Sequence, residues 1–189
     1  IYWRELAINI KAMLIWFFIL SGLGVLVIAF FPTVAKQAES FQQLMTGMPK
    51  GLLAAFGLEQ ISMTDIMGFY ATKQYTTLTL FGSVYAIMLA AGILSKEEND
   101  RTIEFLLSKP VSRSAVIGAK LLSTITLVAF LNLLITIVMY ISLEVVKTGD
   151  YSIKLFLLLS LAALLLHLTF AALGFLASVI IRRSQNALP

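Results

Sequence analysis

Residues 12–31 of the chain read AMLIWFFILSGLGVLVIAFF, a run without a single charged residue. A bilayer core of about 30 Å needs about 20 apolar residues in a helix, and a helix satisfies its own backbone hydrogen bonds there. Pro32 follows the run and predicts its end, because proline cannot continue a helix without losing a hydrogen bond. We therefore expect residues 12–31 to form a membrane-spanning helix.

Three more segments have the length and composition of membrane spans. They cover residues 76–94, 115–143 and 153–181. The last two exceed one bilayer thickness, so we expect them to tilt or to extend into an interface. Hydrophobic residues make up 59% of the chain and charged residues only 13%, against about 25% charged in soluble domains. The excess apolar surface must face lipid, which predicts one all-α, multi-pass membrane helix bundle over residues 1–189.

The composition also excludes several kinds of site. The chain has no cysteine, which excludes disulfides, thiolate metal sites and a cysteine nucleophile. Residues 1–31 do not form a signal peptide, because the apolar run is too long and no small-residue cleavage site follows it. Since the chain begins with Ile1 and ends with Pro189, we expect it to be trimmed at both ends.

The positions of lysine and arginine predict the orientation in the membrane. Nine of the 14 lie at the N-terminus, in residues 95–120 or after residue 181, and five lie in residues 32–75 or 144–154. Each of the two sides carries five acidic residues, so their net charges are +4 and 0. By the positive-inside rule, the N-terminus and residues 95–114 face the cytoplasm. The net charge of +4 therefore reflects orientation, and we expect no nucleic-acid partner.

The external segment, residues 32–75, is too polar to span a membrane and too apolar to be disordered. Phe41, Leu44, Met45 and Met48 follow helical spacing, and further apolar residues continue after Pro49. This pattern is typical of short amphipathic helices that lie on the membrane surface or cap a helix bundle.

Residues 95–114, SKEENDRTIEFLLSKPVSRS, carry the densest charge in the chain. Ser95 and Glu98 fit a capping box, so we expect a short helix to begin at Ser95. Pro110 ends that helix, and Ser112 or Ser114 then caps the third span. The apolar stripe of this helix consists of Ile103, Leu106 and Leu107. A capped, amphipathic and abruptly ended helix suits docking on a soluble partner, whereas the simpler alternative is a solvated connector whose charges fix the topology.

Residues 97–120, EENDRTIEFLLSKPVSRSAVIGAK, resemble the signature of ABC-2-type permeases, the membrane subunits of a class of ATP-binding-cassette transporters. The string combines an acidic pair, TIE at 102–104, LLS at 106–108, PVSR at 110–113 and Lys120. It departs from the family at residues 100–101, because many relatives carry a glycine before the threonine. The resemblance covers the whole chain, but the family normally has six spans, so we expect the last two to be missing by truncation. Residues 2–11, YWRELAINIK, resemble the family's interfacial helix before span one.

The resemblance implies a mechanism and a set of partners. Permeases of this family work in pairs, identical or paralogous, each with a cytoplasmic ATPase subunit that binds ATP and Mg. The loop between spans two and three forms a coupling helix that seats in the ATPase. The resemblance implies export of a substrate across a cytoplasmic membrane, and we expect that membrane to be bacterial. The docking residues that the resemblance carries over are Glu97, Glu98, Ile103, Glu104, Leu106, Leu107, Pro110 and Arg113.

The chain itself is not expected to be an enzyme or to hold a cofactor. It has no GxxxxGK[ST] phosphate loop, so it is not the nucleotide-binding subunit. His167 is the only histidine and lies in span four, which leaves no serine, aspartate and histidine arrangement for catalysis. His167 and Asn132 are candidates for a gating role or for simple hydrogen-bonded packing. The external methionines could bind Cu(I), but their spacing also fits an apolar helix face. They are Met45, Met48, Met63 and Met67.

A different class of function stays open from the sequence alone. The chain could be an ATP-independent secondary carrier or a membrane scaffold for another complex. A carrier should show buried ionisable residues or broken helices within its spans.

Overall fold

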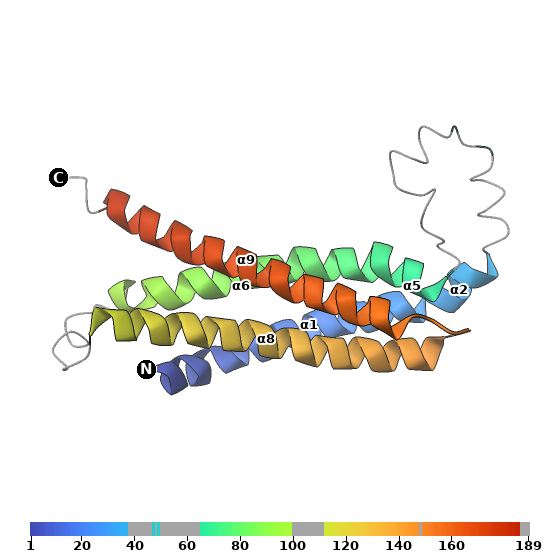
Figure 1. Ribbon diagram of the computed structural model, residues 1–189, viewed down its shortest axis with the longest axis horizontal. Coiled ribbons are helices and arrows are strands. Elements are labelled where there is room, and N and C mark those ends of the chain that lie inside the picture. The colour runs from blue at the N-terminus through green and yellow to red at the C-terminus, as the bar shows by residue number, and fades with distance from the viewer. Residues whose placement is uncertain (38–46, 48, 50–64, 100–111, 148, 186–189) are drawn as a thin grey trace.

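The computed structural model describes residues 1–37, 47, 49, 65–99, 112–147 and 149–185. Helices make up most of these residues, and no strand occurs among them. Four helices are long and apolar enough to cross a membrane, which confirms the all-α, four-span prediction. Figure 1 shows them packed lengthwise in one elongated bundle.

The first span is a single helix, α1, that runs from Tyr2 to Ala29. The separate interfacial helix expected at residues 2–11 is therefore wrong as an independent element. No proline or glycine interrupts α1 before Gly22, so nothing in the sequence breaks the helix at the membrane surface. The N-terminal part also packs inward, since Glu5 is only 4% exposed.

A short helix, α2, covers Phe31–Lys36 and follows α1 after a turn at Phe30. Pro32 lies in the first turn of α2, where the missing N–H has no helical partner to lose. Proline therefore starts a second helix here as well as ending the first. The amphipathic helices predicted around residues 41–56 lie outside the described residues.

The second span begins earlier than the hydropathy predicts. Three helical pieces follow one another without a gap: α5 (Ile66–Phe69), the π-helical turn η1 (Tyr70–Gln74) and α6 (Tyr75–Asn99). The carboxylate of Asp65 accepts a hydrogen bond from the backbone N–H of Gly68 at 3.2 Å, which caps the first turn. The end of the predicted external segment is therefore part of the helix, because a good N-cap precedes the apolar run.

The third and fourth spans are α8 (Arg113–Val146) and α9 (Ile153–Gln185). The hydroxyl of Ser112 accepts a hydrogen bond from the backbone N–H of Ala115 at 3.2 Å. Of the two serines proposed as the cap of this span, Ser112 is the one used.

The four long helices pack as two closely associated pairs. α1 packs most extensively against α8, and α6 against α9. In Figure 1 the members of each pair run in the same direction. A Cβ atom at Gly174 would lie 2.8 Å from the backbone oxygen of Ile87, and Ala86 and Ala90 are fully buried. Small residues therefore let the backbones of α6 and α9 approach closely, as in other membrane bundles.

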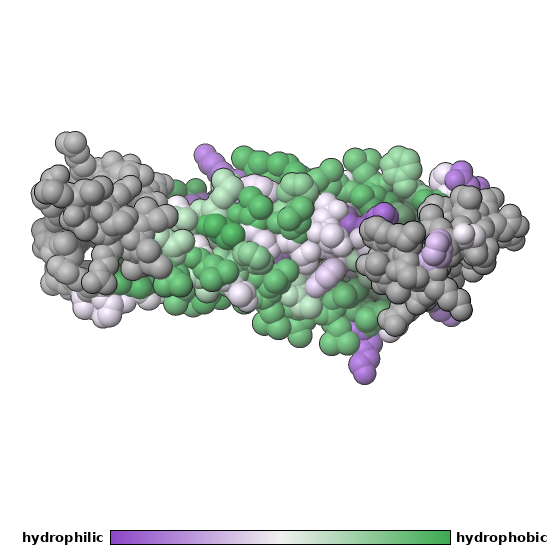
Figure 2. Space-filling model, turned by 90° about the horizontal axis from the view of Figure 1, so that it is seen from above, coloured by the Kyte–Doolittle hydropathy of each residue, from purple (hydrophilic) through white to green (hydrophobic). Residues whose placement is uncertain are grey.

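Apolar side chains also cover the outside of the bundle. Only 22–44% of the residues in the most apolar part of each span are buried within the chain. Figure 2 shows hydrophobic residues over most of the middle of the visible face. A surface of this kind is stable in contact with lipid or with other membrane helices, which agrees with a membrane location.

The two ends of the bundle differ in what they bring together. One end, here called the loop end, holds the N-terminus, the end of α6, the start of α8 and the end of α9 (Figure 1). The other, the turn end, holds α2, α5 and the connection Lys147–Ser152 between α8 and α9. The two helix ends that flank residues 100–111 therefore lie at the loop end, together with the start of α1 and the end of α9.

Candidate functional site

The structure describes only some of the predicted docking residues, and these lie at the loop end. Glu97 and Glu98 belong to the last turns of α6, and Arg113 is the first residue of α8. The other predicted docking residues lie outside the described part of the chain. They are Ile103, Glu104, Leu106, Leu107 and Pro110. The structure therefore gives the backbone position of the two helices that flank the predicted docking segment.

The capping box predicted at Ser95 is wrong. α6 continues through Ser95 and Glu98 to Asn99, so Ser95 lies inside a helix and not at its start. The apolar run before Ser95 is already helical, and residues 95–98, SKEE, do not interrupt it. The second span therefore extends beyond residue 94, into the charged segment.

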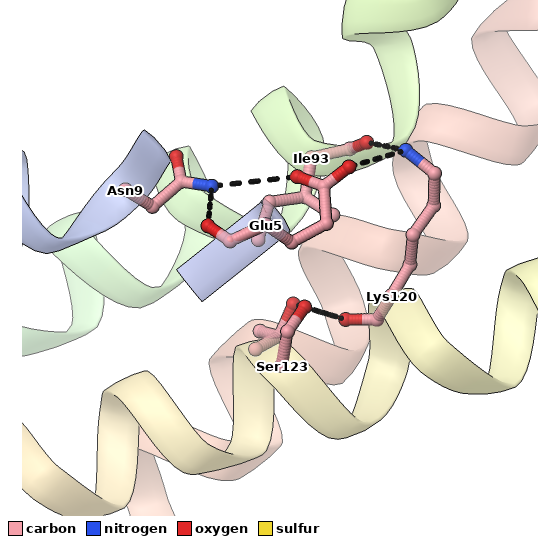
Figure 3. A network of polar contacts seen from close by, with 6 residues as sticks. Glu5, Asn9, Ile93, Lys120 and Ser123 are labelled. Atoms are coloured by element: carbon pink, nitrogen blue, oxygen red, sulfur yellow. Dashed lines mark hydrogen bonds and ion pairs between the residues drawn. The ribbon is translucent and has the colours of Figure 1, made fainter. Parts of the chain in front are cut away.

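A buried ion pair joins one of these flanking helices, α8, to α1. Lys120 of α8 and Glu5 of α1 approach to 3.4 Å between Nζ and Oε1, with side chains only 2% and 6% exposed. The same ammonium group donates a hydrogen bond to the backbone oxygen of Ile93 in α6, at 2.5 Å. Figure 3 shows the lysine reaching toward both partners. One side chain therefore joins three of the four long helices, and we call this arrangement the Lys120 junction.

Neighbouring polar groups complete the Lys120 junction on both sides. The side-chain amide of Asn9 donates to the backbone oxygen of Glu5 at 2.8 Å and to its free carboxylate oxygen, Oε2, at 3.5 Å. The hydroxyls of Ser123 and Thr124 donate to the backbone oxygen of Lys120 at 2.8 and 3.0 Å. Both charged residues are thus held by further hydrogen bonds within their own helices (Figure 3).

The electrostatics of the Lys120 junction favour keeping it intact. Taking two charges out of water is costly, and the attraction between them offsets that cost only when both partners are present. Removing one partner of such a buried pair costs about 3–5 kcal/mol. The pair therefore resists any movement that separates α1 from α8 at this level.

Sequence reasoning assigned Lys120 to the family string but did not single out Glu5. The available signal was a lone acidic residue close before the first apolar run, combined with a lysine within the third span. Unpaired charges in such positions are costly, so each predicts a partner of opposite sign. Their pairing depends on the packing of α1 against α8, which hydropathy does not predict.

A second polar contact lies deeper in the bundle, around His167. The side-chain amide of Asn132 donates to the backbone oxygen of Val128 at 2.8 Å, which leaves its oxygen as an acceptor 3.0 Å from Nδ1 of His167. That nitrogen therefore carries the proton in the neutral ring. A Cβ atom at Gly82 would lie 2.4 Å from the imidazole, so glycine makes room for the ring. His167 is 1% exposed and packs as a hydrogen-bonded residue between α6, α8 and α9.

The turn end carries a different, exposed ion pair. Nζ of Lys147 lies 2.6 Å from Oε2 of Glu144, and the two side chains are 39% and 33% exposed. The hydroxyl of Tyr151 donates to the other carboxylate oxygen of Glu144 at 2.8 Å. The hydrogen bond to Glu144 raises the pKa of Lys147 above its ordinary value. Burial, and then the bond to Glu144, raise the pKa of the Tyr151 hydroxyl.

The polar side chains of the described residues make contacts within and between helices. No three His, Asp or Glu residues among them come together in a way that could hold a metal ion. The Lys120 junction contains a lysine side chain, a carboxylate and hydroxyls bonded to backbone, an arrangement that ties helices together. The Lys120 junction is therefore a candidate for a mechanical role.

Comparison with known proteins gives one match that covers the whole chain. Residues 1–189 match the model of the ABC-2 family transporter proteins. No curated protein and no solved structure matches the chain significantly. The match agrees with the signature read in residues 97–120 and with four apolar helices of spanning length. The chain therefore belongs to the ABC-2 family of transporter proteins, as a multi-pass membrane component.

Proposed function

We propose that this chain is the permease subunit of an ATP-binding-cassette transporter. It moves a substrate, by export, across the cytoplasmic membrane of a bacterium. A separate cytoplasmic ATPase binds ATP and Mg, and supplies the energy. Two permease copies, identical or paralogous, form the pathway. The family match supports the transporter role, and the ATP coupling follows from the resemblance in residues 97–120.

The observation that carries this proposal is the geometry of the loop end. α6 and α8 flank residues 100–111, and both extend past the start of α1 (Figure 1). The Lys120 junction ties these two helices to α1, close to the helix ends that flank the docking segment. A soluble protein bound to that segment would therefore act on helices that are firmly joined to the rest of the bundle.

The placement of charges supports the proposed orientation. The helix ends that meet at the loop end belong to, or adjoin in sequence, the segments that carry nine of the 14 lysine and arginine residues. These segments are the start of α1, the α6–α8 connection and the end of α9. By the positive-inside rule this end faces the cytoplasm, where an ATPase is available.

An ATP-independent carrier is the second candidate. Its support is that Lys120 and Glu5, which are ionisable, are buried within the bundle. The pair is compensated, however, and the four long helices are continuous apart from the π-helical turn η1. A carrier would use an ion gradient, so transport into vesicles that hold the permease without ATPase would favour it. Transport that needs ATP and an ATPase with an intact Walker lysine would exclude it.

Co-purification with an ABC ATPase subunit from the same genome tests the docking role. Glu104→Arg reverses a charge in the predicted docking segment, and we expect about tenfold weaker binding or more, since such pairs carry several kcal/mol. Asp150→Arg makes the same charge change at an exposed position of the turn end and serves as the matched control. We expect it to bind the ATPase as the wild type does. If Glu104→Arg binds and stimulates ATP hydrolysis without loss, the docking assignment is wrong.

A further inference from the structure

The Lys120 junction lies close to both ends of the docking segment. Lys120 follows the first residue of α8 by two turns, and Ile93 precedes the last residue of α6 by less than two. At 1.5 Å per residue, each point is about 10 Å along its helix from the segment. Any displacement of the α6–α8 end must therefore act on this junction first.

The Lys120 junction is also the polar connection from that end to α1. Nζ of Lys120 is shared between the carboxylate of Glu5 in α1 and the backbone oxygen of Ile93 in α6. Direct packing of α1 against α6 is slight compared with its packing against α8. A second polar contact, between Tyr2 and Thr126, also joins α1 to α8, at 3.1 Å between the two hydroxyl oxygens. Near the loop end, α6 is therefore connected to α1 through α8 and its Lys120.

The burial of the Lys120 junction makes this connection stiff. The side chains of Lys120 and Glu5 are only 2% and 6% exposed, so water cannot take the place of either partner. Separating them leaves the buried carboxylate of Glu5 without its cation, a far larger cost than that of tilting a helix as a rigid body. Packed elements that resist deformation move together rather than bend.

We propose that Lys120 and Glu5 are positioning residues that pass a displacement of the docking segment to α1. The inference rests on the proposed function, because it needs an ATPase to move that segment. ATP-driven movement of the α6–α8 end shifts Lys120, and the ion pair carries the start of α1 with it. The ion pair transmits this displacement to α1, and the hydrogen bond to Ile93 makes α6 and α8 move together.

Spin labels can follow the two parts of this path separately. The chain has no cysteine, so single cysteines can be introduced without background. One pair of labels joins Ile117 of α8 to Leu173 of α9, and the other joins Ile8 of α1 to Leu173. All three side chains are exposed, at 53%, 50% and 39% for Ile117, Leu173 and Ile8, and none belongs to the junction. Distances are measured by electron-spin resonance in the permease–ATPase complex, with and without ATP and vanadate, diluted with unlabelled permease.

In the wild type we expect both distance distributions to shift when nucleotide binds. In Lys120→Met the Ile117 pair should still shift, while the shift of the Ile8 pair is lost. Co-purification with the ATPase should be unchanged, because the lysine is buried and does not belong to the predicted docking residues. Lys154→Met, an exposed lysine on α9 at the turn end, is the matched control and should keep both shifts.

Glu5→Gln serves if Lys120→Met fails to fold. It keeps an oxygen that can accept from the ammonium group and leaves the bond to Ile93, but removes the attraction between charges. We expect a smaller shift of the Ile8 pair and an unchanged Ile117 pair. If the Ile8 pair shifts as in the wild type in either folded variant, the inference is overturned while the docking role stands. If the ATPase fails to bind the wild type at all, the proposed function fails and the inference fails with it.

Discussion

The Lys120–Glu5 pair and the Lys147–Glu144 pair involve the same helix, α8, at opposite ends. The first is buried and joins residues 115 positions apart in the sequence. The second is about one-third exposed and joins residues one turn apart. Water screens the second pair and competes for its partners, whereas the first has no such alternative. The same two residue types therefore act as a link between helices at one end and as a local feature of one helix terminus at the other.

The largest effect is expected from removing one partner of the buried pair. Glu5→Leu removes the buried carboxylate that faces the ammonium group of Lys120, which should lower the free energy of unfolding by about 3–5 kcal/mol. The measurement is unfolding by denaturing detergent in mixed micelles, followed by circular dichroism. The double variant Glu5→Leu with Lys120→Met removes both charges and should lose less than Glu5→Leu alone. A double variant that is less stable than either single variant would show that hydrogen bonding, rather than charge compensation, holds the Lys120 junction.

A substitution in the contact of α6 with α9 tests whether close packing stabilises the bundle as much as the buried ion pair does. Gly174→Ala places a Cβ atom 2.8 Å from the backbone oxygen of Ile87, which cannot rotate away. We expect a loss of about 1–3 kcal/mol in the same unfolding measurement. Gly92→Ala is the control, because a Cβ atom there meets nothing within 4 Å. It should be neutral or add up to about 1 kcal/mol through helix propensity. Equal losses in the two variants would mean that the helices do not approach as described.

The contact of His167 with Asn132 is expected to contribute less. Asn132→Leu removes the acceptor for the Nδ1 proton, and hydrogen bonds between membrane helices contribute about 1 kcal/mol each. A double-mutant cycle with His167→Leu measures the coupling between the two side chains. A coupling near zero would assign His167 to packing alone, while a loss of transport without a loss of stability would give it a gating role.

The smallest effect is expected at the exposed pair. Lys147→Ala should leave the free energy of unfolding unchanged within error at pH 7, because solvent screens an exposed ion pair. The sign of any pH dependence follows from the hydrogen bond to Glu144, which raises the pKa of Lys147 in the folded state above its ordinary value of 10.5. Such a contribution is fully present below that value and is lost as the pH rises through the folded-state pKa. Lys147→Ala and the wild type should therefore differ least above pH 10.5, and a difference that grows there would contradict the assignment.

Much of the fold could be predicted because hydropathy and capping are local. Apolar runs of spanning length identified the four helices, and Ser112 was one of two serines proposed as the cap of α8. The boundaries were less predictable. Ser95 looked like an N-cap but lies inside α6, because a capping box begins a helix only where the preceding residues are not already helical. The start at Ile66 was missed because hydropathy alone does not weigh a cap such as Asp65.

The site was predictable only in part, for a related physical reason. The docking segment was predicted from its own sequence pattern, and the transporter class of the chain follows from the family. Glu5 gave no pattern of its own, because its importance lies in a partner that is 115 residues away. The pairing of α1 with α8 and of α6 with α9 likewise depends on which faces fit together, not on any single helix.

The sequence by itself determined the membrane class, the helical fold, the charge asymmetry and the segment that resembles a coupling element. Each follows from composition or from residues within a few turns of one another, where the period of the helix and the thickness of the bilayer set the rules. Only the tertiary structure decided that Lys120 joins α8 to α1 and α6, and that Gly82 and Gly174 let α9 approach α6. Those contacts depend on how the helices pack in three dimensions, because a buried charge or a missing side chain has meaning only beside the group that faces it.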